Sequence, residues 1–305
     1  MIELTHLRHV ALFSVPFEEQ VRFYENLWGL DVVDRQADHV SFRGASDEHH
    51  ILSIIRSSNP GIHHVAFGLR DKHSVDSAAQ TLHELGLPVE GPGPLDEPGG
   101  GYGLRFRDPD GRCIELSAWV ETHTVPWRSK DVDPVRLNHV VLNTPDIDRI
   151  TEFYTTVFNF RVSDWSEHQM VFLRCNQRHH SISFNVAPHA ALNHVAYEVS
   201  GVDEVMRGIA HLREQGVSTL WGPGRHGPGN NVFCYFQDAA GYVAEYTCYL
   251  LDIEDESKYE ARVWKRVKPL MDRWGIAGPP TVEVRRAMRG LPDAGWFLNS
   301  HGQSE

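Results

Sequence analysis

A histidine-valine pair opens four stretches of the chain in which hydrophobic and polar positions follow the same order. The pairs begin at His9, His64, His139 and His194. Each pair lies in a short alternating segment, which predicts a strand. Apolar residues then recur at spacings of three and four, as at Val21, Tyr24 and Leu27, and this spacing predicts a helix. Two or three further strand-like segments follow, so each stretch is interpreted as a βαβββ module.

Glycines and alternation mark the limits of the predicted elements. The helix of the second module is expected to end at Gly86, and that of the fourth module at Gly216. Four of the later strands are expected at Asp38–Gly44, His50–Ile55, Gln169–Cys175 and Ser181–Val186. Strands and helices in this order predict an α+β protein.

The chain also repeats itself at a fixed offset. His9, His64 and Glu115 fall on His139, His194 and Glu245 when the sequence is shifted by 130 residues. Self-similarity of this kind is the signature of a duplication. We therefore predict two tandem domains of two modules each, at 1–121 and 136–250, joined by a linker at 122–135. Residues 251–305 are expected to form a helical and partly disordered tail.

Charge and composition exclude several classes of protein. The 305 residues include 41 acidic and 29 basic side chains, a formal net charge of −12. This balance argues against general binding to nucleic acid or to anionic membranes. No apolar run approaches the ~18 residues that a membrane-spanning helix needs, and the N-terminus lacks the pattern of a secretory signal peptide. The four cysteines show no paired spacing, so we expect reduced thiols in a cytoplasmic protein.

Three side chains of the second half form a candidate metal site. His139 and His194 each open a strand, and the alternation of the last strand puts Glu245 on one face with Val243 and Thr247. Two modules packed side by side would direct all three side chains into one cavity. Two imidazoles and one carboxylate make a facial triad, which leaves half of an octahedral metal open. The spacing alone does not distinguish this site from a second interpretation, in which each histidine is a hydrogen-bonded structural residue.

Five short segments of the second half resemble the catalytic domain of type I extradiol ring-cleavage dioxygenases, members of the vicinal-oxygen-chelate superfamily. They are Leu137–Val140, Asn176–Ser181, Leu192–Val195, Gly224–His226 with Tyr235, and Gly241–Tyr246. The resemblance covers about residues 5–250. It implies that each domain is a partly closed barrel, that the second domain is the catalytic one, and that the protein forms a homo-oligomer.

The resemblance also implies an activity and roles for individual residues. The protein would be an Fe(II) enzyme that inserts both atoms of O2 into an aromatic diol of the catechol type, with Mn(II) as the alternative metal. The implied metal ligands are His139, His194 and Glu245. The implied catalytic residues are His180, which moves protons and hydrogen-bonds the oxygen, together with His226 and Tyr235. His179 is expected on the opposite strand face and receives no role.

Two other functions are compatible with the same fold. A glyoxalase-like lyase or isomerase also holds a divalent metal with histidine and glutamate, usually through a fourth protein ligand. The additional pocket residues His180, His226 and Tyr235 favour the dioxygenase. The second alternative is a non-enzymatic small-molecule binding protein, which would have no use for an intact triad.

The first half keeps the triad spacing at His9, His64 and Glu115 but lacks the catalytic donors. Asp96 stands where the offset places His226, and Arg105 stands where it places Tyr235. We therefore expect a domain without catalytic role, in which His9 and His64 are satisfied core histidines left by the duplication. A second metal site remains the alternative.

The sequence specifies the substrate poorly. Arg225, next to His226, is either a partner for a substrate carboxylate or a solvated loop residue. A charged helix is expected from Ile253 to about Met271. This helix either covers the mouth of the cavity or lies on the surface as an ordinary helix.

Overall fold

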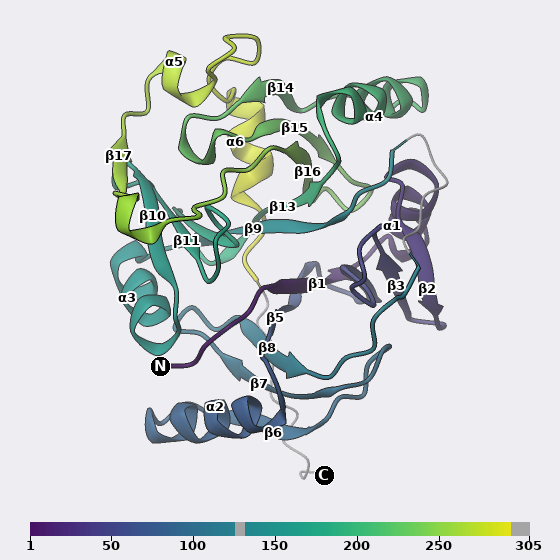
Figure 1. Cartoon of the computed structure of the whole chain (residues 1–305). Coiled ribbons are helices and arrows are strands. Elements are labelled where there is room, and N and C mark those ends of the chain that lie inside the picture. Colours follow the sequence, from purple (N-terminus) through teal and green to yellow (C-terminus); the bar gives the residue numbers. More distant parts are fainter. Residues whose placement is uncertain (126–131, 294–305) are drawn as a thin grey trace.

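The computed structural model describes residues 1–125 and 132–293 and contains two halves of matching architecture (Figure 1). Each half is a strongly curved sheet with helices on its outer side, which confirms the predicted α+β fold of tandem βαβββ modules. Part of the predicted linker, residues 126–131, lies outside the described residues. The same is true of residues 294–305, most of the tail segment for which disorder was expected.

The first half forms one eight-stranded sheet from two modules. Its strands are β1 (Leu7–Ser14), β2 (Asp31–Arg35), β3 (His39–Arg43), β4 (Leu52–Arg56), β5 (Gly61–Gly68), β6 (Val89–Pro94), β7 (Tyr102–Arg107) and β8 (Cys113–Ala118). Its helical elements are α1 (Phe17–Arg22), η1 (Phe23–Leu27) and α2 (Lys72–Glu84). The strand order is β2-β3-β4-β1-β5-β8-β7-β6, so the opening strands of the two modules pair at the centre.

The second half repeats this arrangement. Its strands are β9 (Arg136–Thr144), β10 (Arg161–Ser166), β11 (Met170–Arg174), β12 (Ile182–Val186), β13 (Ala191–Glu198), β14 (Trp221–Arg225), β15 (Val232–Gln237) and β16 (Val243–Cys248). Its helical elements are α3 (Ile147–Val157), α4 (Val202–Glu214) and η2 (Pro228–Asn230). The order is β14-β15-β16-β13-β9-β12-β11-β10-β17, where β17 comes from the tail.

The predicted elements agree with these bounds. The four strands predicted within the modules correspond to β3, β4, β11 and β12, with ends that differ by at most two residues. Helices α2 and α4 end just before Gly86 and Gly216, whose φ angles are +74° and +83°. Glycine adopts this left-handed conformation without a steric penalty, which explains the stop signal. Within the described part of the chain, no helix is long and apolar enough to cross a membrane.

The two halves share one apolar core. The fully buried indole of Trp28, in the first half, stacks on Tyr246 in the second half with ring centroids 3.8 Å apart. Nearby, the buried carboxylate of Asp238 accepts hydrogen bonds from Gln20 at 2.7 Å and from Tyr24 at 2.8 Å. Because these polar groups satisfy one another across the contact, they can be buried between the halves.

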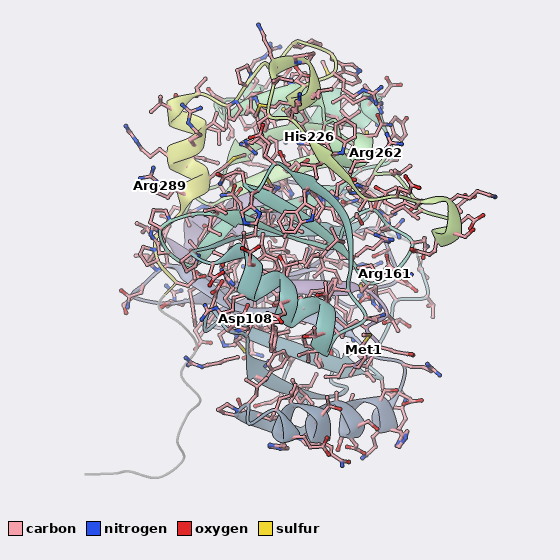
Figure 2. All side chains as sticks on the ribbon, turned by 90° about the vertical axis from the view of Figure 1, so that its left-hand side faces the viewer. Met1, Asp108, Arg161, His226, Arg262 and Arg289 are labelled. Atoms are coloured by element: carbon pink, nitrogen blue, oxygen red, sulfur yellow. The ribbon has the colours of Figure 1, made fainter. Side chains whose placement is uncertain are left out.

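The first residues of the chain also reach the other half. The Ile2 backbone N–H donates to the carbonyl of Val157 at 2.8 Å. Met1 therefore lies near the end of α3, below the level of His226 and Arg262 in Figure 2. A chain segment that precedes β1 thus helps to fix the second half.

The tail differs from the sequence prediction. The prediction of a helix from Ile253 to Met271 is wrong, because this segment is mostly extended. It contains the short elements η3 (Glu256–Lys258), β17 (Arg262–Trp264) and α5 (Lys268–Met271). The main helix of the tail is α6 (Val282–Arg289), which follows the Gly/Pro segment and packs against β13. Figure 1 shows α5 and α6 against the second half.

The reason for the extended segment is an interaction with the sheet edge. β17 pairs parallel with β10, which would otherwise present unpaired backbone groups. The Arg262 backbone N–H and the Trp264 indole N–H donate to the buried carboxylate of Asp164 at 2.8 and 2.7 Å. The free energy gained by hydrogen-bonding a buried carboxylate and the edge of a sheet is larger than the local preference of this segment for a helix.

Candidate active site

Three adjacent strands of the second sheet bring His139, His194 and Glu245 together. These residues lie on β9, β13 and β16, which are neighbours in the strand order. The two Nε2 atoms are 3.4 Å apart. Glu245 Oε2 lies 3.3 Å from His139 Nε2 and 3.2 Å from His194 Nε2. The structure therefore groups the three side chains that the sequence predicts to meet, and all three are buried.

The asparagine before each histidine fixes the orientation of the imidazole. The Oδ1 atoms of Asn138 and Asn193 lie 2.7 and 2.8 Å from Nδ1 of His139 and His194. The Asn138 amide is oriented by Glu198, which can only accept its Nδ2–H at 3.1 Å. An amide oxygen cannot donate, so Nδ1 carries the proton in both rings. Each Nε2 lone pair therefore faces the centre of the cluster.

The orientation of His194 depends on the tail. Asn193 donates from Nδ2 to Asn143 Oδ1 at 3.0 Å. Asn143 donates in turn to the backbone carbonyls of Met288 and Arg289, at the end of α6, at 2.8 and 2.9 Å. Because backbone carbonyls only accept hydrogen bonds, Asn143 must direct its Nδ2 toward α6 and its Oδ1 toward Asn193. This in turn fixes the orientation of the Asn193 amide. Helix α6 thereby sets the tautomer of a site histidine through two asparagines.

The cluster has the geometry and the donor atoms of a divalent metal site. Ligands about 2.1 Å from an octahedral ion at right angles to one another are about 3 Å apart, close to the observed separations. Glu245 Oε2 is fully buried and has no hydrogen-bond partner among the described residues. Burial raises the pKa of Glu245, but the two imidazoles lower it by more, so its pKa lies well below the usual value and the carboxylate is ionised. Two facing imidazole lone pairs and one unpartnered carboxylate oxygen fit a bound cation.

His180 lies beside the cluster and is held by His179. The ring of His180 is 4.3 Å from that of His139 between centroids. His179 Nε2 lies 3.0 Å from Asp164 Oδ2, and His179 Nδ1 lies 2.9 Å from His180 Nδ1. A neutral His179 donates to Asp164 and accepts from His180 Nδ1–H, which leaves the His180 Nε2 lone pair free. The expectation that His179 has no role is therefore corrected, because it connects a buried carboxylate to His180.

His226 and Tyr235 form a hydrogen-bonded pair next to His194. His226 Nδ1 lies 3.3 Å from the carbonyl of Met271, so this nitrogen carries the proton. Its Nε2 can then accept the Tyr235 O–H at 3.0 Å. Burial lowers the pKa of His226 to about 4, and burial with the nearby Glu245 charge raises the pKa of Tyr235 well above its usual value. At neutral pH both groups are therefore uncharged.

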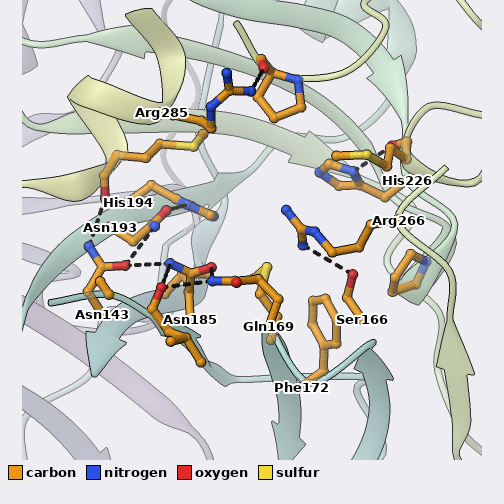
Figure 3. Close-up of a pocket in the computed structure, with 18 of the residues that line it drawn as sticks. Asn143, Ser166, Gln169, Phe172, Asn185, Asn193, His194, His226, Arg266 and Arg285 are labelled. Carbon is orange, nitrogen blue, oxygen red and sulfur yellow. Dashed lines mark hydrogen bonds between the residues drawn. The ribbon is translucent and has the colours of Figure 1, made fainter. Parts of the chain in front are cut away.

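A cavity of about 360 Å³ opens onto these residues. Both site histidines, His180, His226 and Tyr235 line it, and every lining residue comes from positions 139 to 289. Figure 3 shows Phe172, Gln169 and Asn185 on one wall and Arg266 directed inward. The tail supplies a large part of the wall, so the interpretation in which it covers the cavity is the one that the structure favours. The tail residues that line the cavity include Trp264, Lys265, Arg266, Leu270, Met271, Arg285 and Arg289.

Arg225, the arginine considered from the sequence, is not among the arginines that line the cavity. It donates to the Asn230 carbonyl at 2.8 Å and lies over the ring of Trp274. Arg266 instead reaches the cavity wall, where its Nη1 donates to Ser166 Oγ at 3.2 Å. Arg225 is the last residue of β14 and is half-buried, so the interpretation as a solvated loop residue is not confirmed either. The sequence carried no signal for Arg266, whereas the repeated Asn-His pairs at 138–139 and 193–194 could have revealed the two asparagines.

Buried neutral histidines predict a loss of stability in acid. Burial lowers the pKa of His50 and His63 to about 3 and that of His226 to about 4. In the unfolded chain these pKa values return to about 6.5, so below that pH the unfolded state binds more protons and stability falls as pH falls. Between about pH 7.5 and about pH 5.5, each histidine removes about 1.4 kcal/mol from the free energy of unfolding, about 4 kcal/mol for the three.

Urea unfolding of metal-free protein at the two pH values measures this effect. We expect His50→Gln to reduce the loss by about 1.4 kcal/mol. The control variant is His168→Gln, at an exposed histidine. An unfolding free energy that is equal at both pH values would contradict the prediction.

A family model described as the Glyoxalase/Bleomycin resistance protein/Dioxygenase superfamily matches residues 6–116 and again residues 136–246. The chain belongs to this superfamily. The two matched segments correspond to the two sheets, so the superfamily unit occurs twice in this member. The fold expected from the resemblance is thereby confirmed.

Among its relatives, this superfamily member is similar to proteins named as extradiol enzymes. The manganese-dependent 2,3-dihydroxybiphenyl 1,2-dioxygenase of Geobacillus genomosp. 3 is 28% identical over 258 residues, 77% of this chain and 82% of that protein. The iron-dependent extradiol dioxygenase of Rhodococcus jostii is 30% identical over 174 residues, 50% of this chain and 58% of that protein. The resemblance to extradiol dioxygenases is therefore confirmed by these two relatives, which match 77% and 50% of this chain.

Solved structures of superfamily members are also similar. The Mn(II)-bound glyoxalase from Novosphingobium aromaticivorans is 34% identical, with a TM-score of 0.88 over 98% of this chain and 97% of that one. Homoprotocatechuate 2,3-dioxygenase from Arthrobacter globiformis has a TM-score of 0.86 over 99% and 96% of the two chains. Because only 21% of the residues are identical, the similarity to the Arthrobacter globiformis structure shows the fold alone.

Proposed function

We propose that this protein is a divalent-metal-dependent extradiol dioxygenase that opens the ring of a catechol-type substrate with both atoms of O2. The observation that carries the proposal is a cluster of two histidines and one glutamate, able to hold a metal ion, that opens onto a cavity lined by His180, His226 and Tyr235. Three protein ligands leave positions of an octahedral ion open, as catalysis on two bound reactants requires. The names of the relatives support the same activity.

The metal in the proposal is Fe(II), with Mn(II) as the alternative, held by His139, His194 and Glu245. When bound there, it would supply adjacent positions for the two catechol oxygens and for O2 and would favour ionisation of the catechol. Both ions accept a facial set of two nitrogens and one oxygen. The named relatives include one manganese-dependent and one iron-dependent enzyme.

The surrounding side chains would move protons. A catechol hydroxyl beside Tyr235 can donate to the Tyr235 oxygen while Tyr235 donates to His226 Nε2, which forms a path for one proton. His180 offers a free Nε2 lone pair on the other side of the cluster and can take a proton and return it. The tail over the cavity excludes water, which strengthens these interactions.

The charge of the cavity indicates an anionic substituent on the substrate. Four cationic residues of the tail line it, and none of the lining residues in the described part of the chain is acidic. They are Lys265, Arg266, Arg285 and Arg289. The guanidinium of Arg266 lies at the inner wall, where it uses one donor on Ser166 and has others left for a carboxylate.

Replacing Arg266 by methionine tests this specificity. We expect KM for a catechol that carries a carboxylate side chain to rise about 10- to 100-fold, because a hydrogen bond to a charged group contributes about 1.5–3 kcal/mol. KM for unsubstituted catechol should change little. The exposed Arg262, on β17 but outside the cavity lining, gives the control variant Arg262→Met. An equal effect on both substrates would contradict the assignment.

A glyoxalase-like reaction is the second candidate, because a structure named glyoxalase is 34% identical to this chain. Oxygen uptake by anaerobically reconstituted protein separates the two. With Fe(II) or Mn(II) and a panel of substituted catechols, the dioxygenase consumes one O2 per catechol and forms a yellow ring-opened product. No uptake by protein that holds metal at the triad, together with turnover of a hemithioacetal, would favour the glyoxalase-like reaction.

A further inference from the structure

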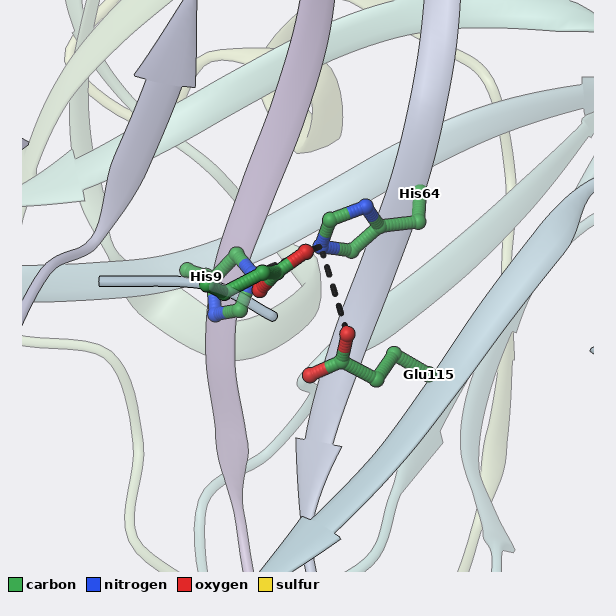
Figure 4. Close-up of side chains that lie close together, drawn as sticks. His9, His64 and Glu115 are labelled. Carbon is green, nitrogen blue, oxygen red and sulfur yellow. Dashed lines mark hydrogen bonds and ion pairs between the residues drawn. The ribbon is translucent and has the colours of Figure 1, made fainter. Parts of the chain in front are cut away.

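A second cluster of metal-binding side chains lies at the equivalent place in the first half. His9, His64 and Glu115 lie on the three central strands β1, β5 and β8, as their counterparts do in the second half (Figure 4). Glu97, between β6 and β7, adds a second carboxylate; the sequence offset had pointed to its neighbour Asp96. One donor atom from each of the four side chains lies within 4.8 Å of the others.

The separations of these donor atoms suit four-coordination. The Nε2 atoms of His9 and His64 are 2.6 Å apart and share a hydrogen bond, which a bound ion would replace. Each nitrogen lies 3.6 Å from an oxygen of Glu97, and His64 Nε2 lies 3.8 Å from Glu115 Oε2. Ligands about 2.1 Å from a tetrahedral ion are about 3.4 Å apart, which falls within the observed range.

A buried carboxylate oxygen without a hydrogen-bond partner is a second, independent indication that the cluster binds a cation. Glu115 is fully buried, and its Oε1 has no hydrogen-bond partner among the described residues. His9 Nδ1, also buried, has none either, so His9 is satisfied only at Nε2, through its hydrogen bond with His64. A buried carboxylate that lacks a donor at one oxygen is costly, and a cation held by Glu115 would offset that cost.

Arg105 is placed to support such an ion from outside. It faces Glu115 across the β7–β8 pair, as Tyr235 faces Glu245 across the β15–β16 pair. Its guanidinium donates to Glu115 Oε2 at 2.8 and 3.1 Å and also pairs with Glu97. Burial and the nearby Glu115 charge raise the pKa of the half-buried Glu97 to about 8, so without an ion Glu97 keeps its proton and Arg105 balances Glu115. A divalent cation held by both carboxylates would take the place of that proton. Carboxylate ligands of metals are commonly held by such outer donors.

We propose that His9, His64, Glu97 and Glu115 form a second metal site, which binds Zn²⁺ or a similar divalent transition ion and stabilises the first half. Two nitrogen and two oxygen ligands suit this class of ion. Four protein ligands and burial make the site closed, in contrast to the three ligands and open cavity of the second half. The site is therefore structural and is independent of the proposed ring cleavage.

Metal content of the full chain tests the proposal without reference to activity. Chelator-stripped protein is loaded with Zn²⁺, freed of excess by gel filtration and analysed by plasma mass spectrometry. We expect two ions per chain in the wild type, one in His194→Ala and one in His64→Ala. Since His64→Ala could disturb β5, Glu97→Gln in the loop provides a milder variant. In the His194→Ala background, zinc should raise the melting temperature, and Glu97→Gln should remove most of that increase.

The alternative is that the guanidinium of Arg105 takes the place of a metal ion as the cation of this cluster. In that case the wild type would bind one ion, His194→Ala would bind none, and a second ion would appear only in Arg105→Gln. That pattern would overturn the proposal. If the site exists as proposed, Arg105→Gln should retain two ions with a zinc affinity reduced about 10- to 100-fold, the usual effect of losing an outer partner. The result does not depend on whether any catechol is cleaved.

Discussion

His194→Ala is expected to abolish ring cleavage, with kcat/KM reduced about 10⁴-fold or more, since the metal contributes several kcal/mol to the transition state. The Nε2 atom of His194 lies 3.4 Å from that of His139 and 3.2 Å from Glu245 Oε2, so its removal takes away one of three converging ligands. Alanine leaves the neighbouring strands β9 and β16 intact. The expected loss is therefore of the metal and not of the fold.

Oxygen uptake and bound iron, measured on the same sample, check this result. Iron content should fall together with activity in His194→Ala, while circular dichroism stays unchanged. The control is His168→Ala, which removes an exposed imidazole between β10 and β11 that does not line the cavity. A His194→Ala protein that retains both iron and oxygen uptake would show that the triad is misassigned.

Replacing His180 by glutamine is expected to lower kcat about 10²- to 10⁴-fold, the usual contribution of a positioned acid–base group. The expected bound iron is unchanged, because His180 lies beside the triad without belonging to it. Glutamine keeps a polar side chain of similar length but cannot carry a proton between two partners. The loss should therefore appear in kcat more than in KM.

The variant His179→Gln leaves the His180 imidazole in place but removes the side chain that orients it, so it distinguishes the effect of orientation from that of proton transfer. His179 lies between Asp164 and His180, at 3.0 and 2.9 Å, and is fully buried. Its replacement should reduce kcat about 10- to 100-fold, as loss of an outer hydrogen-bond partner does, and should shift the pH profile of kcat. Single-turnover kinetics with both variants measure the difference. If His180→Gln and His168→Gln have the same kcat, His180 has no part in the chemistry.

Local patterns were sufficient to predict the modules and the duplication. Strand alternation and helical spacing are set by backbone geometry within a few residues, so they can be recognised without knowledge of the fold. The offset that relates His9 to His139 and Glu115 to Glu245 is likewise visible in the linear order of residues. This offset predicts the tandem α+β fold. The grouping of His139, His194 and Glu245 was expected from modules packed side by side and from the resemblance to a family, because spacing alone left a structural interpretation of each histidine.

The tail could not be predicted in the same way. Its residues between Ile253 and Met271 have helix-compatible spacing, yet β17 forms because Asp164 and the edge of β10 accept its backbone. These partners lie about a hundred residues earlier in the chain. Consequently Arg266, which β17 directs toward the cavity, carried no signal in the sequence.

The order of residues along the chain is enough to specify the duplicated fold and the residue types that meet at the centre of each sheet, because strand pairing brings like positions of the modules together. How these residues are used depends instead on tertiary packing. The orientation of His194 depends on Asn143 and α6, and that of His180 on His179. The fourth side chain of the first cluster, Glu97, is supplied by a loop whose path no periodicity encodes. Such contacts depend on how distant segments dock, and docking free energy is a property of the whole packed molecule.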